Sequence, residues 1–232
     1  VNNELKENSI NKNFIVAIIF FVFFSCSNNE EKINYLSVQE LLDLSNQKIS
    51  NSQSFSFVLN HKNGFTSLPG GYKISKAEGD IEKPDKLQIK AELISNNFLI
   101  KLSYLSLENN YWITNPINFE WIKTPEEDNP FKNINPINII SDIFTEIEDE
   151  SISSVNKGLY EISAKINSNN LKSLVGDIII PNEKINLSLI IKDDGSVKKI
   201  YIYGKVQPED NYETIREINF EKWNEKISWQ QP

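Results

Sequence analysis

Residues 87–107 read LQIKAELISNNFLIKLSYLSL, and this stretch decides the fold. Every second residue from Leu87 to Leu93 is apolar, which is the period of a β-strand with one buried face. A second alternating run follows Asn96-Asn97. Because asparagine tolerates a positive φ, an Asn-Asn pair between two such runs indicates a tight turn. The stretch therefore predicts an antiparallel hairpin.

The same alternation recurs on both sides of this hairpin. Asn, Asp, Gly and Pro separate the apolar runs, with expected turns at Asn109-Asn110 and Asp193-Asp194-Gly195. The sequence predicts strands at 54–61, 87–93, 98–107, 111–114, 159–166, 178–180, 187–191, 197–206 and 214–220. Short strands in this order are typical of a meandering antiparallel sheet.

A few helices interrupt the strands. Ser37 and Glu40 have the spacing of a capping box and predict a short amphipathic helix up to Ile49. Residues 137–147 place their apolar side chains on one face at a spacing of 3.6 and predict a second helix, and 170–174 a brief helical turn. The expected fold class is α+β, built around an antiparallel sheet.

Composition excludes several classes of function. The 232 residues carry a formal net charge of −8, so the basic surface that nucleic-acid binding needs is missing. A single Cys and a single His exclude disulfide frameworks and zinc sites built from several such ligands. Neither GxGxxG nor GxxxxGK[ST] occurs, and no cofactor is expected.

The N-terminal residues have the pattern of a targeting segment. Residues 14–24 are all apolar, a run too short to span a bilayer but suited to a secretory signal. Phe23-Phe24-Ser25-Cys26 resembles a lipobox, although Phe replaces the usual Leu and the preceding residues carry no net charge. The resemblance implies that Cys26 is acylated and anchors the chain on the extracytoplasmic face of the cell membrane or envelope. An ordinary signal peptide and a weak membrane anchor remain the alternatives.

The sequence offers little support for a set of catalytic residues. His61 lies in the polar stretch NHKNG and is interpreted as an exposed turn residue rather than part of a triad. The acidic runs at 126–128 and 146–150 are interpreted as a solvated face rather than as paired hydrolytic carboxylates. We therefore expect that the protein is not an enzyme.

Aromatic residues gather near Asn115-Pro116 and near the end of the chain. Exposed rings would form a carbohydrate platform, whereas packed rings would stabilise hairpins, and the second interpretation is favoured. The residues concerned are Tyr111, Trp112, Phe119, Trp121, Trp223 and Trp229.

Several segments occur in an order that resembles a known family. They are SFSFVLNH at 54–61, AEGDIEKPDKLQIKA at 77–91, YWITNPINFEW at 111–121, DNPF at 128–131 and VGDIIIPNEKINLSLIIKDDGSVKKIYIYG at 175–204. This series resembles the LppX/LprA/LprF/LprG bacterial lipoprotein family over roughly residues 36–220. The resemblance implies the fold shared with LolA and LolB: a strongly curved antiparallel sheet, an open half-barrel, with helices covering its concave face. It also implies a lipid or glycolipid ligand, non-catalytic binding and a membrane transport partner.

These expectations give a domain plan and a set of candidate site residues. Residues 1–25 are expected to be a lipoprotein signal peptide, 26–35 a tether and 36–232 the lipid-binding domain. A curved sheet leaves an apolar interior that suits hydrocarbon, at about 0.8 kcal/mol for each buried CH₂. The candidate cavity residues are Phe55, Phe57, Leu59, Leu87, Ile89, Leu102, Ile139, Ile140, Ile143 and Phe144.

Two rival functions stay open at this point. A surface-anchored interaction protein would have a filled core and an exposed apolar patch in place of a cavity. A hydrolase would need two carboxylates facing each other across a cleft.

Overall fold

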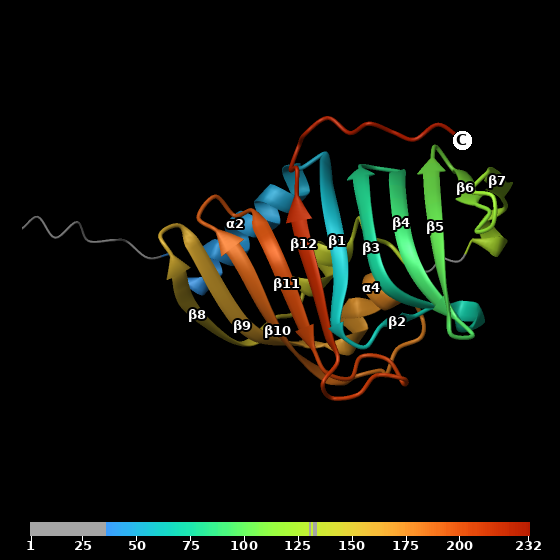
Figure 1. Ribbon diagram of the computed structural model, residues 1–232. Helices are drawn as coiled ribbons and strands as arrows, with labels where there is room; N and C mark the ends of the chain where they lie inside the picture. Colours follow the sequence, from blue (N-terminus) through green and yellow to red (C-terminus); the bar gives the residue numbers. More distant parts are fainter. Residues whose placement is uncertain (1–35, 130, 132–133) are drawn as a thin grey trace, which may run out of the picture. The chain divides into compact units, whose positions relative to one another are not determined.

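A single antiparallel sheet organises the part of the chain that the structure describes, which is residues 36–129, 131 and 134–232 of a computed structural model (Figure 1). Within these residues twelve strands pair in the order β7-β6-β5-β4-β3-β1-β12-β11-β10-β9-β8, with β2 paired to β3 outside this path. The strands are β1 Ser54–Asn63, β2 Thr66–Ser67, β3 Lys73–Glu82, β4 Lys86–Ser95, β5 Phe98–Leu107, β6 Asn110–Thr114, β7 Trp121–Thr124, β8 Glu148–Asn156, β9 Leu159–Asn167, β10 Lys184–Lys192, β11 Val197–Tyr203 and β12 Ile215–Glu221. The expected signal peptide, tether and Cys26 lie outside the described residues.

The helices are short and lie on one face of the sheet, behind it in Figure 1. They are α2 Val38–Asn51, α3 Ile139–Ile143 and α4 Lys172–Val175, with 3-10 turns η1 Pro69–Gly71, η2 Glu126–Asp128 and η3 Ser168–Leu171. The sheet is open, because β7 and β8 end the strand path without pairing to each other. This is the predicted α+β architecture, an open curved antiparallel sheet with one covered face (Figure 1).

The hairpin that the sequence specifies most clearly is confirmed. β4 and β5 pair from Leu87↔Ser106 to Ser95↔Phe98. The turn residues Asn96 and Asn97 have φ values of 47° and 67°, as a two-residue hairpin turn requires. The next turn lies one residue earlier than predicted, at Glu108 and Asn109, because Asn110 already belongs to β6.

The capping box is confirmed as well. The Ser37 hydroxyl accepts a hydrogen bond from the Glu40 backbone N–H at 3.2 Å, and the Ser37 N–H donates to Glu40 Oε2 at 2.8 Å. These two bonds satisfy donors that a helix start leaves free. Helix α2 extends two residues beyond the predicted end, to Asn51.

The helix predicted for 137–147 is wrong in length. Only Ile139–Ile143 is helical, and the chain then turns into the edge strand β8, which the sequence did not predict. Glu148 pairs with Lys165 in the neighbouring strand β9. Because this pairing holds the residues from Glu148 onward in a strand, the helix ends earlier than the spacing of its apolar residues indicated.

Two further strand predictions need correction. Residues 178–180 form no strand; the Ile180 N–H donates to the Val206 carbonyl at 2.9 Å, and the Ile180 carbonyl accepts from the Ser168 hydroxyl at 2.6 Å. The strand predicted to reach Val206 ends at Tyr203, since Gly204 with a φ of 92° starts a loop.

The chain connects the two edge strands of the sheet directly. The described residues of 125–147, which are 125–129, 131 and 134–147 and are called here the cover segment, lead from β7 at one edge to β8 at the other. They contribute buried apolar side chains to the core and thus cross the covered face. Residues 36–232 form one compact unit that contains this core and the whole sheet, so this range is expected to fold by itself.

The opposite face of the sheet is mostly polar, and the C-terminal residues after β12 pass over part of it. The Gln88 side chain donates to the Ser228 carbonyl at 3.1 Å and accepts from the Gln230 N–H at 3.0 Å. Leu105 and Ile227 are buried outside the main core.

Candidate functional site

All ten cavity residues expected from the sequence lie in one core between the sheet and its helices. Each is at most 9% exposed, so the alternation in β1, β4 and β5 correctly identified the inward face. The cover segment supplies four of the ten, through α3 and the residue after it.

This core contains a small apolar cavity of about 20 Å³. Its wall consists of Phe57, Leu59, Ile74, Ala77, Ile89, Phe131, Ile134, Pro136, Ile139, Leu174 and Ile218. A volume of this size holds about one water molecule, whereas sites for small molecules enclose roughly 300–1,000 Å³. Side chains therefore fill the interior almost completely in this conformation.

Only four of the ten expected residues reach the cavity wall: Phe57, Leu59, Ile89 and Ile139. Phe55 instead packs on Trp223 and Phe220, with ring centroids 5.1 and 6.0 Å apart, as expected for a packed terminal aromatic. The other five, Leu87, Leu102, Ile140, Ile143 and Phe144, are buried in the same core away from the wall.

Sequence reasoning missed seven wall residues. Ile218 follows the alternation of its strand, and Phe131 belongs to the quoted DNPF motif, so both had a usable signal. Ala77 likewise begins the quoted motif at 77–91. Ile74 and Leu174 were harder to find, because Ile74 precedes a register shift in β3 and Leu174 lies on a four-residue helix.

Apolar packing holds the cover segment against the sheet. The Phe131 ring lies 5.3 Å from that of Tyr104, and Asn129 Nδ2 donates to the Tyr104 hydroxyl at 2.9 Å. Two contacts join the segment to α4: the Asn135 N–H donates to the Ser173 carbonyl at 2.8 Å, and the Ser173 hydroxyl donates to the Asp142 carboxylate.

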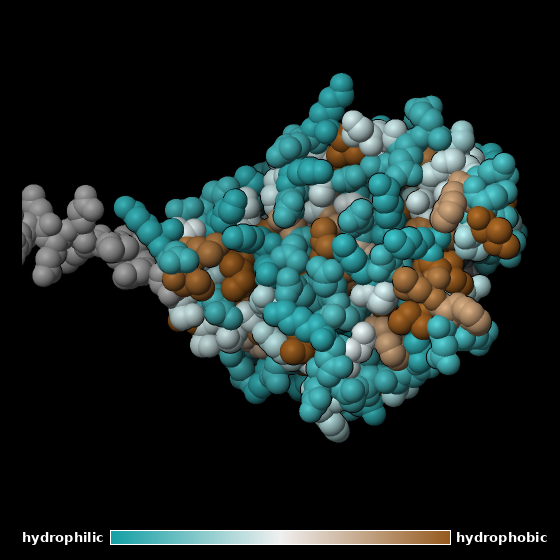
Figure 2. Space-filling view, in the orientation of Figure 1, coloured by the Kyte–Doolittle hydropathy of each residue, from teal (hydrophilic) through white to brown (hydrophobic). Residues whose placement is uncertain are grey.

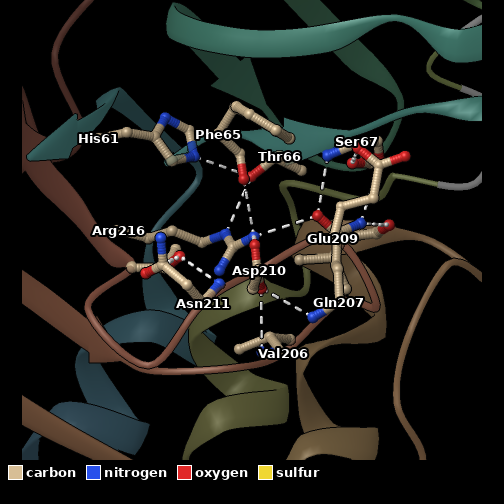
Figure 3. A network of polar contacts seen from close by, with 12 residues as sticks. His61, Phe65, Thr66, Ser67, Val206, Gln207, Glu209, Asp210, Asn211 and Arg216 are labelled. Atoms are coloured by element: carbon tan, nitrogen blue, oxygen red, sulfur yellow. Dashed lines mark hydrogen bonds and ion pairs between the residues drawn. The ribbon is translucent and has the colours of Figure 1, made fainter. Parts of the chain in front are cut away.

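A buried polar network stabilises the loops beside α4 (Figure 3). The Arg216 side chain is fully buried, and its Nη2 donates to Asp210 Oδ1 at 2.8 Å. Asp210 Oδ2 in turn accepts the Val206 and Gln207 N–H groups at 2.9 and 2.7 Å. The Gln207 amide donates to the Val175 carbonyl at 3.3 Å and so connects the network to α4.

His61 belongs to the same network, and its predicted position in an exposed turn is wrong. It is half-buried within β1, with Nδ1 2.9 Å from the Ser75 carbonyl and Nε2 3.0 Å from Thr66 Oγ1 (Figure 3). A carbonyl only accepts, so Nδ1 carries the proton and Nε2 accepts from the threonine hydroxyl. Thr66 Oγ1 receives its own bond from Arg216 Nε at 3.0 Å.

These surroundings favour the neutral imidazole. Burial lowers the pKa of His61 most, the Ser75 hydrogen bond and Asp210 raise it, and the nearby Arg216 charge also lowers it, so that the pKa falls to about 4. The histidine therefore acts as a structural hydrogen-bonding group at neutral pH, and its neighbours do not include a nucleophile–acid pair of the triad type.

The remaining sequence candidates lie at the surface. The acidic residues of 126–128 and 146–150 are exposed, as expected for a solvated face. Tyr111, Trp112 and Trp121 are half-buried in hairpins, but Phe119 is 63% exposed and does not pack as predicted.

The described residues contain neither a metal site nor a membrane-spanning helix. No group of three or more His, Cys, Asp or Glu side chains there has the arrangement of a metal site. No helix in the same residues has the length and apolar character needed to cross a membrane.

These features define a class: an open antiparallel sheet whose one apolar face is closed by short helices and a crossing segment. LprF from Mycobacterium bovis has this fold, with a TM-score of 0.63 at 11% identity over 84% of this chain and 96% of that chain. The lipoprotein LppX from Mycobacterium tuberculosis aligns with a TM-score of 0.55 at 13% identity over 83% of this chain and 99% of that chain. The fold expected from the sequence motifs is therefore confirmed.

Other comparisons add little. A LolA superfamily protein from Nitrosomonas europaea aligns with a TM-score of 0.32, which is too low to support a shared fold. No family model and no curated protein matches the chain.

Replacing Asp210 by alanine tests the buried network. Because Arg216 would keep its charge without a partner, we expect the free energy of unfolding to fall by about 3–5 kcal/mol in urea titrations of residues 36–232. The matched control is Glu209→Ala, whose carboxylate is exposed and pairs with Lys73 at 2.7 Å. This control should leave the urea midpoint of unfolding nearly unchanged. Equal effects of the two substitutions would contradict a stabilising role of the buried Asp210–Arg216 pair.

The pH dependence of stability tests the state of His61. Its folded pKa of about 4 lies below the ordinary histidine value of 6.5, so the unfolded chain binds more protons between these pH values. Stability should therefore decline as the pH falls from about 6.5 to 4, by at most about 3 kcal/mol from this group. In the variant His61→Gln, this part of the dependence of stability on pH should be lost. An unchanged dependence would show that the histidine does not contribute to it.

Proposed function

We propose that this chain is a non-catalytic cell-envelope lipoprotein that binds the acyl chains of a lipid or glycolipid between its sheet and the covering helices. Acylated Cys26 would anchor it to the extracytoplasmic face, residues 26–35 would form the tether, and 36–232 the binding domain. The observation that carries the proposal is the apolar cavity between the sheet and its cover, whose wall contains no charged side chain. The fold shared with LprF and with the lipoprotein LppX supports it.

The size of the cavity imposes a condition on this function. An acyl chain cannot enter about 20 Å³, so the cover segment must separate from the sheet when cargo binds. The gain is sufficient in principle, since a chain of about 15 methylenes gains roughly 12 kcal/mol on leaving water. This gain offsets the loss of apolar contacts between the sheet and the cover segment.

Transport would follow from the same opening. A cover that separates to admit an acyl chain also separates to release it, so a membrane partner that binds the open form would receive the cargo.

A second function is favoured by two observations. The interior is almost filled, and large apolar side chains are exposed at one corner of the sheet, as a surface-anchored interaction protein without cargo would require. The two functions differ in whether lipid co-purifies with the folded domain.

Native mass spectrometry of residues 36–232, purified without detergent and then incubated with envelope lipids, distinguishes them. The carrier function predicts a reproducible added mass of lipid size that is lost on denaturation. A clean apo mass after this incubation would exclude the carrier function and favour the interaction protein.

The cavity wall offers a matched pair of substitutions. Ala77 lines the cavity, whereas Ala164 is equally buried in the core away from it. Because added methyl groups at the wall occupy the space where cargo enters, Ala77→Val should reduce lipid loading severalfold in the same mass spectra. Ala164→Val should retain loading, and equal losses in the two variants would contradict a site at this cavity.

A further inference from the structure

Two neighbouring turns expose large apolar side chains at one end of the sheet. Alternate turns of a meander lie at the same end, so the β4–β5 turn and the β6–β7 loop are adjacent. Phe98, Leu99, Ile117 and Phe119, called here the apolar tip, are 72%, 60%, 87% and 63% exposed. Figure 2 shows brown side chains gathered at the right of the molecule, where Figure 1 places these strands.

The four side chains form one surface rather than two. Both turns line a single open depression, whose wall also contains Ser95, Asn96, Ile100, Pro116 and one charged residue, Lys101, which pairs with Glu92. The neighbouring polar groups at the turn tips are uncharged amides and hydroxyls. Patches of this kind on soluble domains mark interaction sites.

Charge identifies the partner. Residues 93–100 and 111–119 contain no charged side chain, although 24% of the chain is charged. The charged residues that flank them balance: Lys101 lies 3.7 Å from Glu92, and Glu120 and Lys123 have opposite signs. An electrically neutral surface therefore fits the tip, and the net charge of −8 disfavours an anionic one.

We propose that the apolar tip docks on the surface of a lipid bilayer with zwitterionic headgroups. Protruding turns insert apolar side chains at the interface, while uncharged asparagines remain at the level of the headgroups. Lysine side chains beside the tip extend toward the lipid phosphates without burying their charge. The anchor of the proposed function keeps a bilayer within reach of the domain, which favours this partner over a second copy of the chain.

Docking at this place would orient the domain. Helix α2 begins the described chain and contacts β8, whereas the tip lies at the other side of the sheet. Eleven strands at about 4.8 Å give a path of roughly 50 Å along the curved sheet from one edge to the other. Attachment at the N-terminal side and docking of the tip would hold the domain at two distant points, so its orientation relative to the bilayer would be fixed.

Co-sedimentation of residues 36–232 with phosphatidylcholine vesicles tests the docking, because this range lacks the proposed anchor. The double variant Phe98→Ser/Phe119→Ser should partition about tenfold or more weakly, since both side chains leave water on docking. The control variant Ile152→Ser/Val155→Ser removes two exposed apolar side chains from β8, at the opposite edge, and should partition like the unchanged domain. Circular dichroism verifies that both variants are folded.

Three results would overturn the proposal. They are equal partitioning of the two double variants, stronger binding when phosphatidylglycerol replaces phosphatidylcholine, and a concentration-dependent dimer that the Phe98→Ser/Phe119→Ser variant abolishes. Lipid loading in native mass spectra should be the same in this variant and the unchanged domain. Failure of docking is therefore separable from failure of cargo binding.

Discussion

The apolar face of an open sheet must be kept from water, and this constraint governs the described structure. A closed barrel would protect that face by itself, but here β7 and β8 do not pair. Protection comes from three short helices and from the cover segment, which joins the two edge strands across the face. Any molecule that enters the interior must therefore compete with this cover for the same apolar surface.

Different interactions hold the elements beside α4 and the cover segment in place. Beside α4, a buried ion pair and its hydrogen bonds connect β12 to the loops at 65–67 and 204–211. Removing one partner from such a network is costly, so this side is expected to remain fixed. The cover segment has a five-residue helix without a side-chain N-cap and rests mainly on apolar contacts, with hydrogen bonds to Tyr104 and Ser173. Apolar contacts can be replaced by hydrocarbon, so this side is the one suited to open.

Sequence patterns predicted the sheet well because alternation and turn chemistry are local. The Asn96-Asn97 turn, the capping box at Ser37 and the inward faces of β1 and β4 are confirmed for this reason. Tertiary pairing was not visible, so β2, β3, β7 and β8 were missed and the helix before β8 was predicted too long. His61 was misplaced because its partners Ser75 and Thr66, and Arg216, which bonds Thr66, come from three other segments. The residues of the site were predictable as an inward face, but their distribution around a cavity was not.

Hydrogen exchange of residues 36–232 tests the central claim that the cover segment opens for cargo. The account predicts that amides of residues 134–147 exchange much faster than those of β10–β12 in the apo domain, and slow markedly once a lipid has bound. Exchange of the cover segment at the rate of global unfolding, with no change on adding lipid, would contradict it.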